Sequence, residues 1–117
     1  ARAEREGLKN VRAQKSEGDD PKLAAASADR VLIVDVWHHI PARGELAKKL
    51  AAALRKDGAI YLVDFKLDSE RGPPKKHKLT PESVMADLKA GGLVCELLKV
   101  DLPDQYVVVA RRPAGTP

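Results

Sequence analysis

The sequence predicts one α/β domain built on a doubly wound, mostly parallel sheet that ends in an antiparallel hairpin. The apolar run at residues 29–40 is typical of a strand buried on both faces. A second apolar strand, residues 59–65, follows one helix later, and this order forms a βαβ unit with a right-handed crossover. Two further strands, residues 93–100 and 105–110, flank a short turn and are close enough in sequence to pair as a hairpin.

The opening of the chain predicts the end of a helix followed by an exposed strand. Residues 1–7 have the composition of the last turns of a helix, which Gly7 closes. Residues 10–16 alternate weakly between apolar and polar positions, as an edge strand does. Turn chemistry at residues 17–21 and a short connector lead to the strand at residues 30–36. Because the chain starts inside a helix and without Met, we expect the domain to be incomplete on its N-terminal side.

Two helices are predicted from the spacing of apolar residues and from their end signals. The first occupies residues 43–56, where leucine and alanine recur at helical spacing until Asp57 and Gly58 end it. Residues 66–78 are rich in charge, glycine and proline, so they are expected to form a loop. The second helix has the clearest boundaries, with Thr80 as N-cap, proline at the first helical position and a pair of glycines at its end.

Composition limits the classes of protein that the chain can belong to. Its 117 residues are 44% apolar and 32% charged, which fits a single globular domain, residues 1–117. The net charge of +4 is spread along the chain, which disfavours a nucleic-acid partner. One cysteine, Cys95, excludes an internal disulfide and predicts a reducing, cytoplasmic location. No apolar run approaches the roughly 20 residues that a membrane span needs.

Two segments resemble the carboxyl-terminal part of class I S-adenosylmethionine-dependent methyltransferases. Residues 29–40 read Asp-Arg-Val-Leu-Ile-Val-Asp-Val-Trp-His-His-Ile and resemble that family's fourth strand and the turn after it. Residues 54–65 resemble the helix end and fifth strand, which the family commonly writes Leu-(Arg/Lys)-Pro-Gly-Gly, with mild differences at Asp57 and Ala59. The resemblance extends over almost the whole chain. It implies a Rossmann-like fold, S-adenosyl-L-methionine as cofactor and a small-molecule methyl acceptor.

The sequence also departs from this family pattern. The Gly-x-Gly-x-Gly turn that lies against the cofactor, and the strand before it, have no counterpart here. In the family this strand pairs with the one that residues 30–36 resemble, so that strand should have a free edge, and a free apolar edge invites pairing with another chain. We expect a partner or preceding sequence to supply the missing N-terminal half, or the chain to self-associate through this edge. The gap leaves open a non-catalytic interaction module or another nucleotide-binding domain.

The resemblance implies a set of cofactor-binding residues at the ends of two strands. In the family, an acid after the early strand lies near the adenine amino group, and the end of the fourth strand lines the adenine and methionine portions. The residues at these positions are Glu17, Gly18, Asp19, Asp35, Val36 and Trp37. Each has a structural alternative, because acids in turns are commonly solvated, tryptophan commonly packs in the core, and a buried carboxylate needs partners.

His38 and His39 are the candidate catalytic residues. Imidazole titrates near neutrality, so one of them can act as a general base that removes a proton from the acceptor, although a capping or solvated histidine is the structural alternative. Adjacent residues of an extended chain point to opposite sides, so we expect no shared metal ion. Asp64, at the end of the next strand, is expected either to contact substrate or to be solvated. Methyl transfer itself needs alignment of donor and acceptor rather than a nucleophilic residue.

Overall fold

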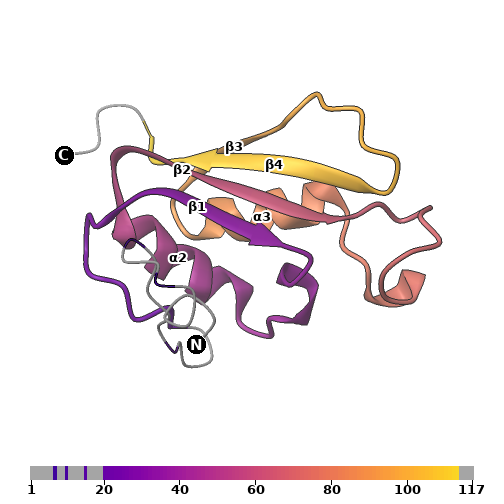
Figure 1. Cartoon of the computed structure of the whole chain (residues 1–117), viewed down its shortest axis with the longest axis horizontal. Helices are drawn as coiled ribbons and strands as arrows, with labels where there is room; N and C mark the ends of the chain where they lie inside the picture. Colours follow the sequence, from indigo (N-terminus) through magenta and orange to yellow (C-terminus); the bar gives the residue numbers. More distant parts are fainter. Residues whose placement is uncertain (1–6, 8–9, 11–14, 16–19, 114–117) are drawn as a thin grey trace.

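The computed structural model describes residues 7, 10, 15 and 20–113. Four strands form one sheet in the order β1-β2-β4-β3: β1 (Ala28–Val34), β2 (Leu54–Phe65), β4 (Gln105–Arg111) and β3 (Val94–Leu97). The β1 and β2 strands are parallel, whereas β4 is antiparallel to both β2 and β3 (Figure 1). The predicted α/β fold and its C-terminal hairpin are therefore confirmed. The predictions for residues 1–7 and 10–16 fall almost entirely outside the described residues.

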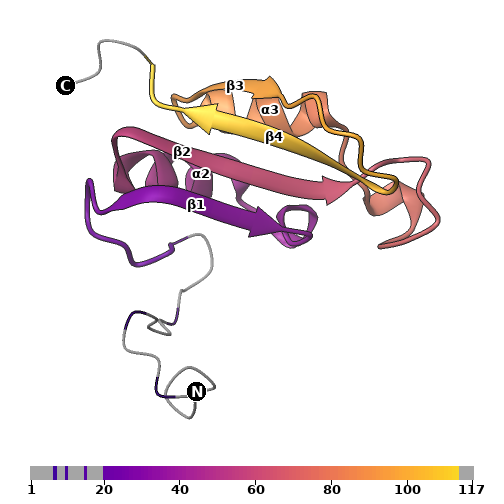
Figure 2. The same ribbon diagram turned by 45° about the horizontal axis from the view of Figure 1, so that its top comes forward.

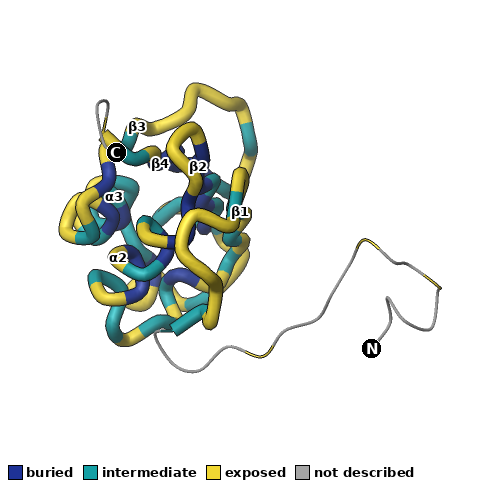
Figure 3. The backbone as a smooth tube through the Cα atoms, turned by 90° about the vertical axis from the view of Figure 1, so that its left-hand side faces the viewer, coloured by how far each residue is buried: buried dark blue, intermediate teal, exposed yellow. Residues whose placement is uncertain are grey.

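Two helices connect the strands and lie on the same face of the sheet. α2 (Arg43–Ala53) joins β1 to β2, and α3 (Pro81–Ala90) joins β2 to β3. Figure 3 shows both helices on one side of the strands. Leu50 of α2 and Leu88 of α3 are buried in the hydrophobic core. Two single 3-10 turns, η1 (Trp37–His39) and η2 (Lys75–His77), follow β1 and β2. No helix in the described part of the chain is both long and apolar enough to cross a membrane.

β1 is buried on one face rather than on both, which corrects the sequence prediction. Val31 and Ile33 pack against the helix layer, whereas Leu32 and Val34 are 70% and 44% exposed on the opposite face. The reason is that both helices of the described chain cover the same side of the sheet, so residues of β1 alternate between inside and outside. β1 is also the edge strand of the described sheet, as predicted (Figure 2).

β2 begins earlier than the sequence predicts, at the expense of the first helix. The helix ends at Ala53, and Leu54 is fully buried as the first residue of β2, where it pairs with Ala28. Gly58 allows the close approach of the two strands, because a Cβ there would lie 3.0 Å from the carbonyl oxygen of Ala28. The expected helix continuation to residue 56 was wrong because tertiary pairing with β1 overrides a locally helical pattern.

The second helix begins and ends where the sequence predicts. The hydroxyl oxygen of Thr80 accepts a hydrogen bond from the backbone N–H of Ser83 at 3.0 Å, and Pro81 is the first helical residue. Val84 and Leu88, four residues apart, are fully buried against the sheet. The chain leaves the helix through Gly91, which lies against α2 and returns the backbone toward β3.

Candidate functional site

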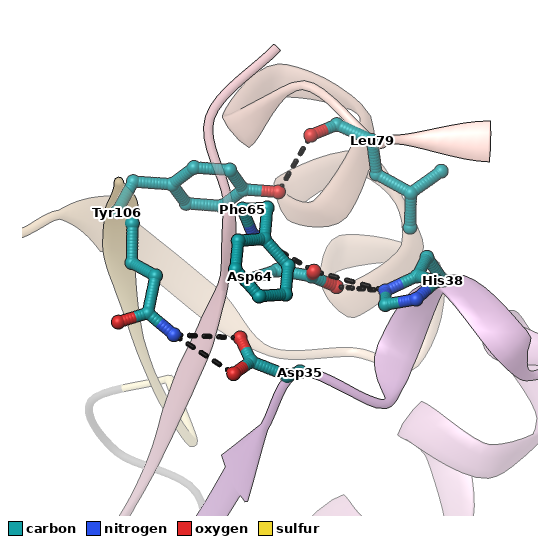
Figure 4. Close-up of polar contacts among 7 residues, drawn as sticks. Asp35, His38, Asp64, Phe65, Leu79 and Tyr106 are labelled. Atoms are coloured by element: carbon teal, nitrogen blue, oxygen red, sulfur yellow. Dashed lines mark hydrogen bonds and ion pairs between the residues drawn. The ribbon is translucent and has the colours of Figure 1, made fainter. Parts of the chain in front are cut away.

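Polar side chains gather where β1 and β2 end. The two strands are parallel, so their carboxyl ends share one edge of the sheet, the position at which open α/β sheets bind ligands. Asp35 and η1 follow β1, and Asp64 lies near the end of β2. Figure 4 shows these groups close together at this edge, with Tyr106 of β4 beside them. The sequence predicted this meeting of strand ends, and the structure confirms it.

Asp35 is held by a hydrogen-bond partner from the far end of the chain. Its backbone has a left-handed φ of 58°, and its N–H donates to the Val63 carbonyl at 2.8 Å, which continues the β1–β2 pairing into the turn. Both carboxylate oxygens accept from the side-chain amide of Gln105 at 2.8 Å. The carboxylate at the strand end is therefore satisfied within the protein, as a partly buried charge requires.

Trp37 is part of the hydrophobic core. Its side chain is fully buried, and the indole N–H donates to Asp87 of α3 at 3.2 Å. The same Asp87 oxygen accepts from the Nε of Arg43 at 2.8 Å. The hydrogen bond to Asp87 thus links η1 to the helix layer through Trp37.

His38 and Asp64 form a buried pair. The Nδ1 atom of His38 lies 2.9 and 3.1 Å from the two carboxylate oxygens of Asp64, and their side chains are 3% and 1% exposed (Figure 4). The carboxylate also accepts the backbone N–H of Phe65 at 2.8 Å. The expected solvation of Asp64 was therefore wrong, because its side chain is buried. Its partner is 26 positions away, which no local pattern reveals.

His39 lies beside His38 but on the exposed side of the turn. The two ring centroids are 4.1 Å apart with a tilt of 46°, so the rings do not point to opposite sides of the chain. The expectation of opposite directions assumed an extended chain, whereas these residues form a 3-10 turn. Among the described residues, no group of three or more His, Cys, Asp or Glu side chains is arranged to hold a metal ion.

An open cavity of about 370 Å³ lies at the carboxyl end of β1. Its wall combines side chains from β1, η1 and α2 with the segment that precedes β1: Asp20, Pro21, Ile33, Val36, His39, Ile40, Leu46 and Leu50. Two of the predicted site residues, Val36 and His39, line it. Of the other cofactor candidates, Glu17, Gly18 and Asp19 lie outside the described residues.

Asp20 is the cavity residue that sequence reasoning missed, although it follows directly after the predicted Asp19. It supplies the only carboxylate among the described residues that line this cavity. A hydrogen bond from the backbone N–H of Lys22, at 2.8 Å, lowers the pKa of Asp20 below its usual value. Asp20 is therefore an ionised acceptor at neutral pH.

Tyr106 and Cys95 are poor candidates for acid–base chemistry. Burial raises the pKa of Tyr106, the nearby Asp64 and Glu82 carboxylates raise it further, and its hydroxyl donates to the Leu79 carbonyl at 2.7 Å. Burial also raises the pKa of Cys95, whose sulfur lies 3.5 Å from the Met85 carbonyl oxygen. Both groups stay protonated at neutral pH.

The sequence profile of a family described as a methyltransferase domain matches residues 1–62. The chain therefore belongs to the methyltransferase domain family, and its fold is that of the class I S-adenosylmethionine-dependent enzymes. A comparison with curated proteins gave no match.

Solved structures share the fold at low sequence identity. A SAM-dependent methyltransferase from Aquifex aeolicus is 21% identical with a TM-score of 0.83, over 93% of this chain and 58% of that one. The trans-methyltransferase CalH, solved with SAH, is 16% identical with a TM-score of 0.72, over 96% and 39% of the two chains. The [4+2]-cyclase SpnF is 11% identical with a TM-score of 0.76, over 97% and 61%. The chain thus spans about half the length of these proteins.

Proposed function

We propose that this chain is part of an S-adenosylmethionine-dependent methyltransferase that acts on a small molecule. The family assignment supports methyltransferase chemistry. The observation that carries the proposal for this site is the cavity at the carboxyl end of β1, where Asp20, Val36 and His39 meet. This is the edge at which sheets of this type bind nucleotides, and the cavity volume is in the usual range for small ligands, roughly 300 to 1,000 Å³.

The cavity suits the adenosine end of such a cofactor. Ile33, Val36 and Ile40 supply an apolar wall for a flat ring, and the Asp20 carboxylate can accept hydrogen bonds from an amino group or from ribose hydroxyls. We propose Glu17, Gly18 and Asp19 as further contacts, because they precede Asp20 directly. Asp35 and Trp37 contribute indirectly, because their hydrogen bonds hold in place the turn that carries Val36.

When bound, the sulfonium cofactor supplies an activated methyl group, so the protein contributes alignment and exclusion of water. The side chains around the cavity can contribute to both alignment and the exclusion of water. Leu46 and Leu50 contribute apolar side chains to the cavity wall, and η1 borders the cavity through His39. The half-buried Cys95 is compatible with the cytoplasmic location that we propose.

Calorimetry with S-adenosylmethionine tests this function. We expect micromolar binding by the chain, and we expect Asp20→Asn to weaken it about tenfold, because a hydrogen bond to a charged group contributes roughly 1.5 kcal/mol or more. Asp29→Asn is the matched control, since Asp29 is an exposed carboxylate paired with Arg55 at the other end of β1.

The two alternative functions predict different results in the calorimetry. Absence of any binding heat contradicts the proposal and favours a non-catalytic interaction module. Equal affinity for adenosine nucleotides would instead indicate a general nucleotide-binding domain.

We also propose that β1 pairs with the same strand of a second copy of the chain. In the described sheet β1 has β2 as its single neighbour, and Leu32 and Val34 are exposed on it. Asp29 and Arg30 are charged, but from Val31 to Val34 this edge carries neither proline nor a charged residue, and such an edge is prone to pairing.

Light scattering should therefore report a dimer, and Val34→Lys should convert it to a monomer by placing a charge at the edge. Val94→Lys, on the edge strand at the other side of the sheet, should leave the dimer intact. A monomeric chain whose β1 amides exchange slowly with solvent would disprove this pairing.

A further inference from the structure

The buried pair of His38 and Asp64 is the strongest polar feature that the proposed function does not yet use. Its two members come from different elements, η1 and β2, and meet at the edge of the sheet where both strands end (Figure 4). Burying two ionisable groups is costly unless they are paired with good geometry. Here both carboxylate oxygens lie within 3.1 Å of Nδ1.

The contacts of Asp64 fix the proton on one nitrogen of His38. An ionised carboxylate only accepts hydrogen bonds, so Nδ1 must be the protonated nitrogen of the ring. In the neutral imidazole, Nε2 then carries the free lone pair. The backbone N–H of Phe65 holds the carboxylate itself in place at 2.8 Å, so the orientation of the ring is determined by the end of β2.

The other nitrogen of His38 retains a small accessible surface, in a side chain that is 3% exposed. Nε2 makes no hydrogen bond to a described residue, and no buried side-chain nitrogen or oxygen in this part of the chain lacks a partner. Nε2 is therefore in the part of the side chain that remains accessible. The ring centroid of His38 is 4.1 Å from that of His39, which lines the cavity. A proton acceptor of fixed orientation thus lies beside the proposed cofactor site.

Building on the proposed function, we propose that Asp64 is the positioning residue for His38, which acts as general base, and that the methyl acceptor is a hydroxyl or enol. The acceptor oxygen forms its bond to the methyl carbon as the carbon–sulfur bond breaks, and the electron pair of that bond stays on sulfur, which leaves as a neutral thioether. The proton of the hydroxyl passes to Nε2. The Asp64 carboxylate then stabilises the imidazolium by its negative charge.

Other described groups near the strand ends do not fit this role. The hydroxyl of Tyr106 is committed to the Leu79 carbonyl, and Asp35 is occupied by Gln105. His39 lacks a carboxylate partner among the described residues, so its proton is not fixed on either nitrogen. His38 is thus the group that combines a fixed orientation with a free lone pair.

The first test is a spectroscopic one on the unmodified chain. In ¹⁵N spectra of the imidazole rings at neutral to basic pH, we expect His38 to be protonated at Nδ1 and unprotonated at Nε2. Asp64→Asn should abolish this preference, because an amide can present either a donor or an acceptor to Nδ1. A wild-type ring that keeps its proton on Nε2 overturns the proposal without any variant.

The second test compares transfer to a phenolic acceptor among variants of the full chain. We expect His38→Gln to lower kcat at least a hundredfold and Asp64→Asn to lower it at least tenfold, with the dissociation constant for S-adenosylmethionine unchanged within about twofold. His77→Gln, an exposed histidine of η2, is the matched control and should leave both unchanged. Transfer to a thiol, which ionises more easily, should depend less on His38.

The two proposals fail in different ways. Absence of S-adenosylmethionine binding overturns the proposed function and this inference with it. Binding and transfer that survive undiminished in folded His38→Gln overturn only the inference. Transfer confined to acceptors without a removable proton also overturns it, since a base is then not needed.

Discussion

Replacing Gly91 with alanine will destabilise the chain by about 3 kcal/mol. A Cβ at this position would lie 2.7 Å from the Ala47 carbonyl carbon and the Lys48 nitrogen. These are backbone atoms within α2, so they cannot move aside as the tip of a flexible side chain would. The two helices must separate, and overpacking of this kind costs roughly 1–3 kcal/mol, occasionally more. Urea unfolding monitored by circular dichroism measures the change.

Gly44→Ala is the matched control for this substitution. Gly44 lies on α2, and a Cβ there would meet the Cβ of Ala90 at 3.8 Å, an ordinary contact. Because alanine favours helix more than glycine, we expect a gain of up to about 1 kcal/mol. If Gly91→Ala unfolds at the same urea concentration as the wild-type chain, the close packing of α2 on the end of α3 is disproved.

Trp37→Ala will lower the free energy of unfolding by about 3–5 kcal/mol, as truncation of a large buried side chain does. The indole is fully buried in the core, and its loss also removes the hydrogen bond to Asp87. Trp37→Phe should cost less, since it keeps most of the apolar volume. The chain contains one tryptophan, so its fluorescence reports the unfolding of the wild-type chain directly.

This substitution also separates the two roles considered for Trp37. If the residue is purely a packing residue, Trp37→Phe should retain the wild-type affinity for S-adenosylmethionine while it is folded. Val36→Ala changes an exposed position of the cavity wall. It should weaken the binding of S-adenosylmethionine and leave the free energy of unfolding almost unchanged. A Trp37→Ala chain as stable as the wild type would contradict the core position.

Local signals in the sequence predicted much of this fold. The cap at Thr80, the proline after it and the glycines at the end of α3 each act within a single turn, so their effect can be read without knowledge of the rest of the chain. The apolar runs of β1 and β2 and the helix between them were sufficient for the βαβ unit. A site at the end of β1 was predicted, and Val36 and His39 line the cavity that lies there.

Features that depend on distant contacts could not be predicted in this way. Leu54 has the pattern of a helical residue but joins β2, because it pairs with Ala28. Asp64 is buried in contact with His38, 26 positions away, and the hydrogen-bond partner of Asp35 is Gln105, 70 positions away. The pattern of β1 gave no sign of which face would be covered, since that depends on where the helices pack.

Asp87 connects the helix layer directly to the turn that follows β1. Its carboxylate accepts from Trp37 in η1 and from Arg43 at the start of α2, while its own backbone belongs to α3. Three segments thus share one oxygen atom as a common anchor. Because Trp37 directly precedes His38 and His39 in η1, we expect a substitution that shifts α3 to change the position of both imidazoles, and with it the proton transfer that we propose.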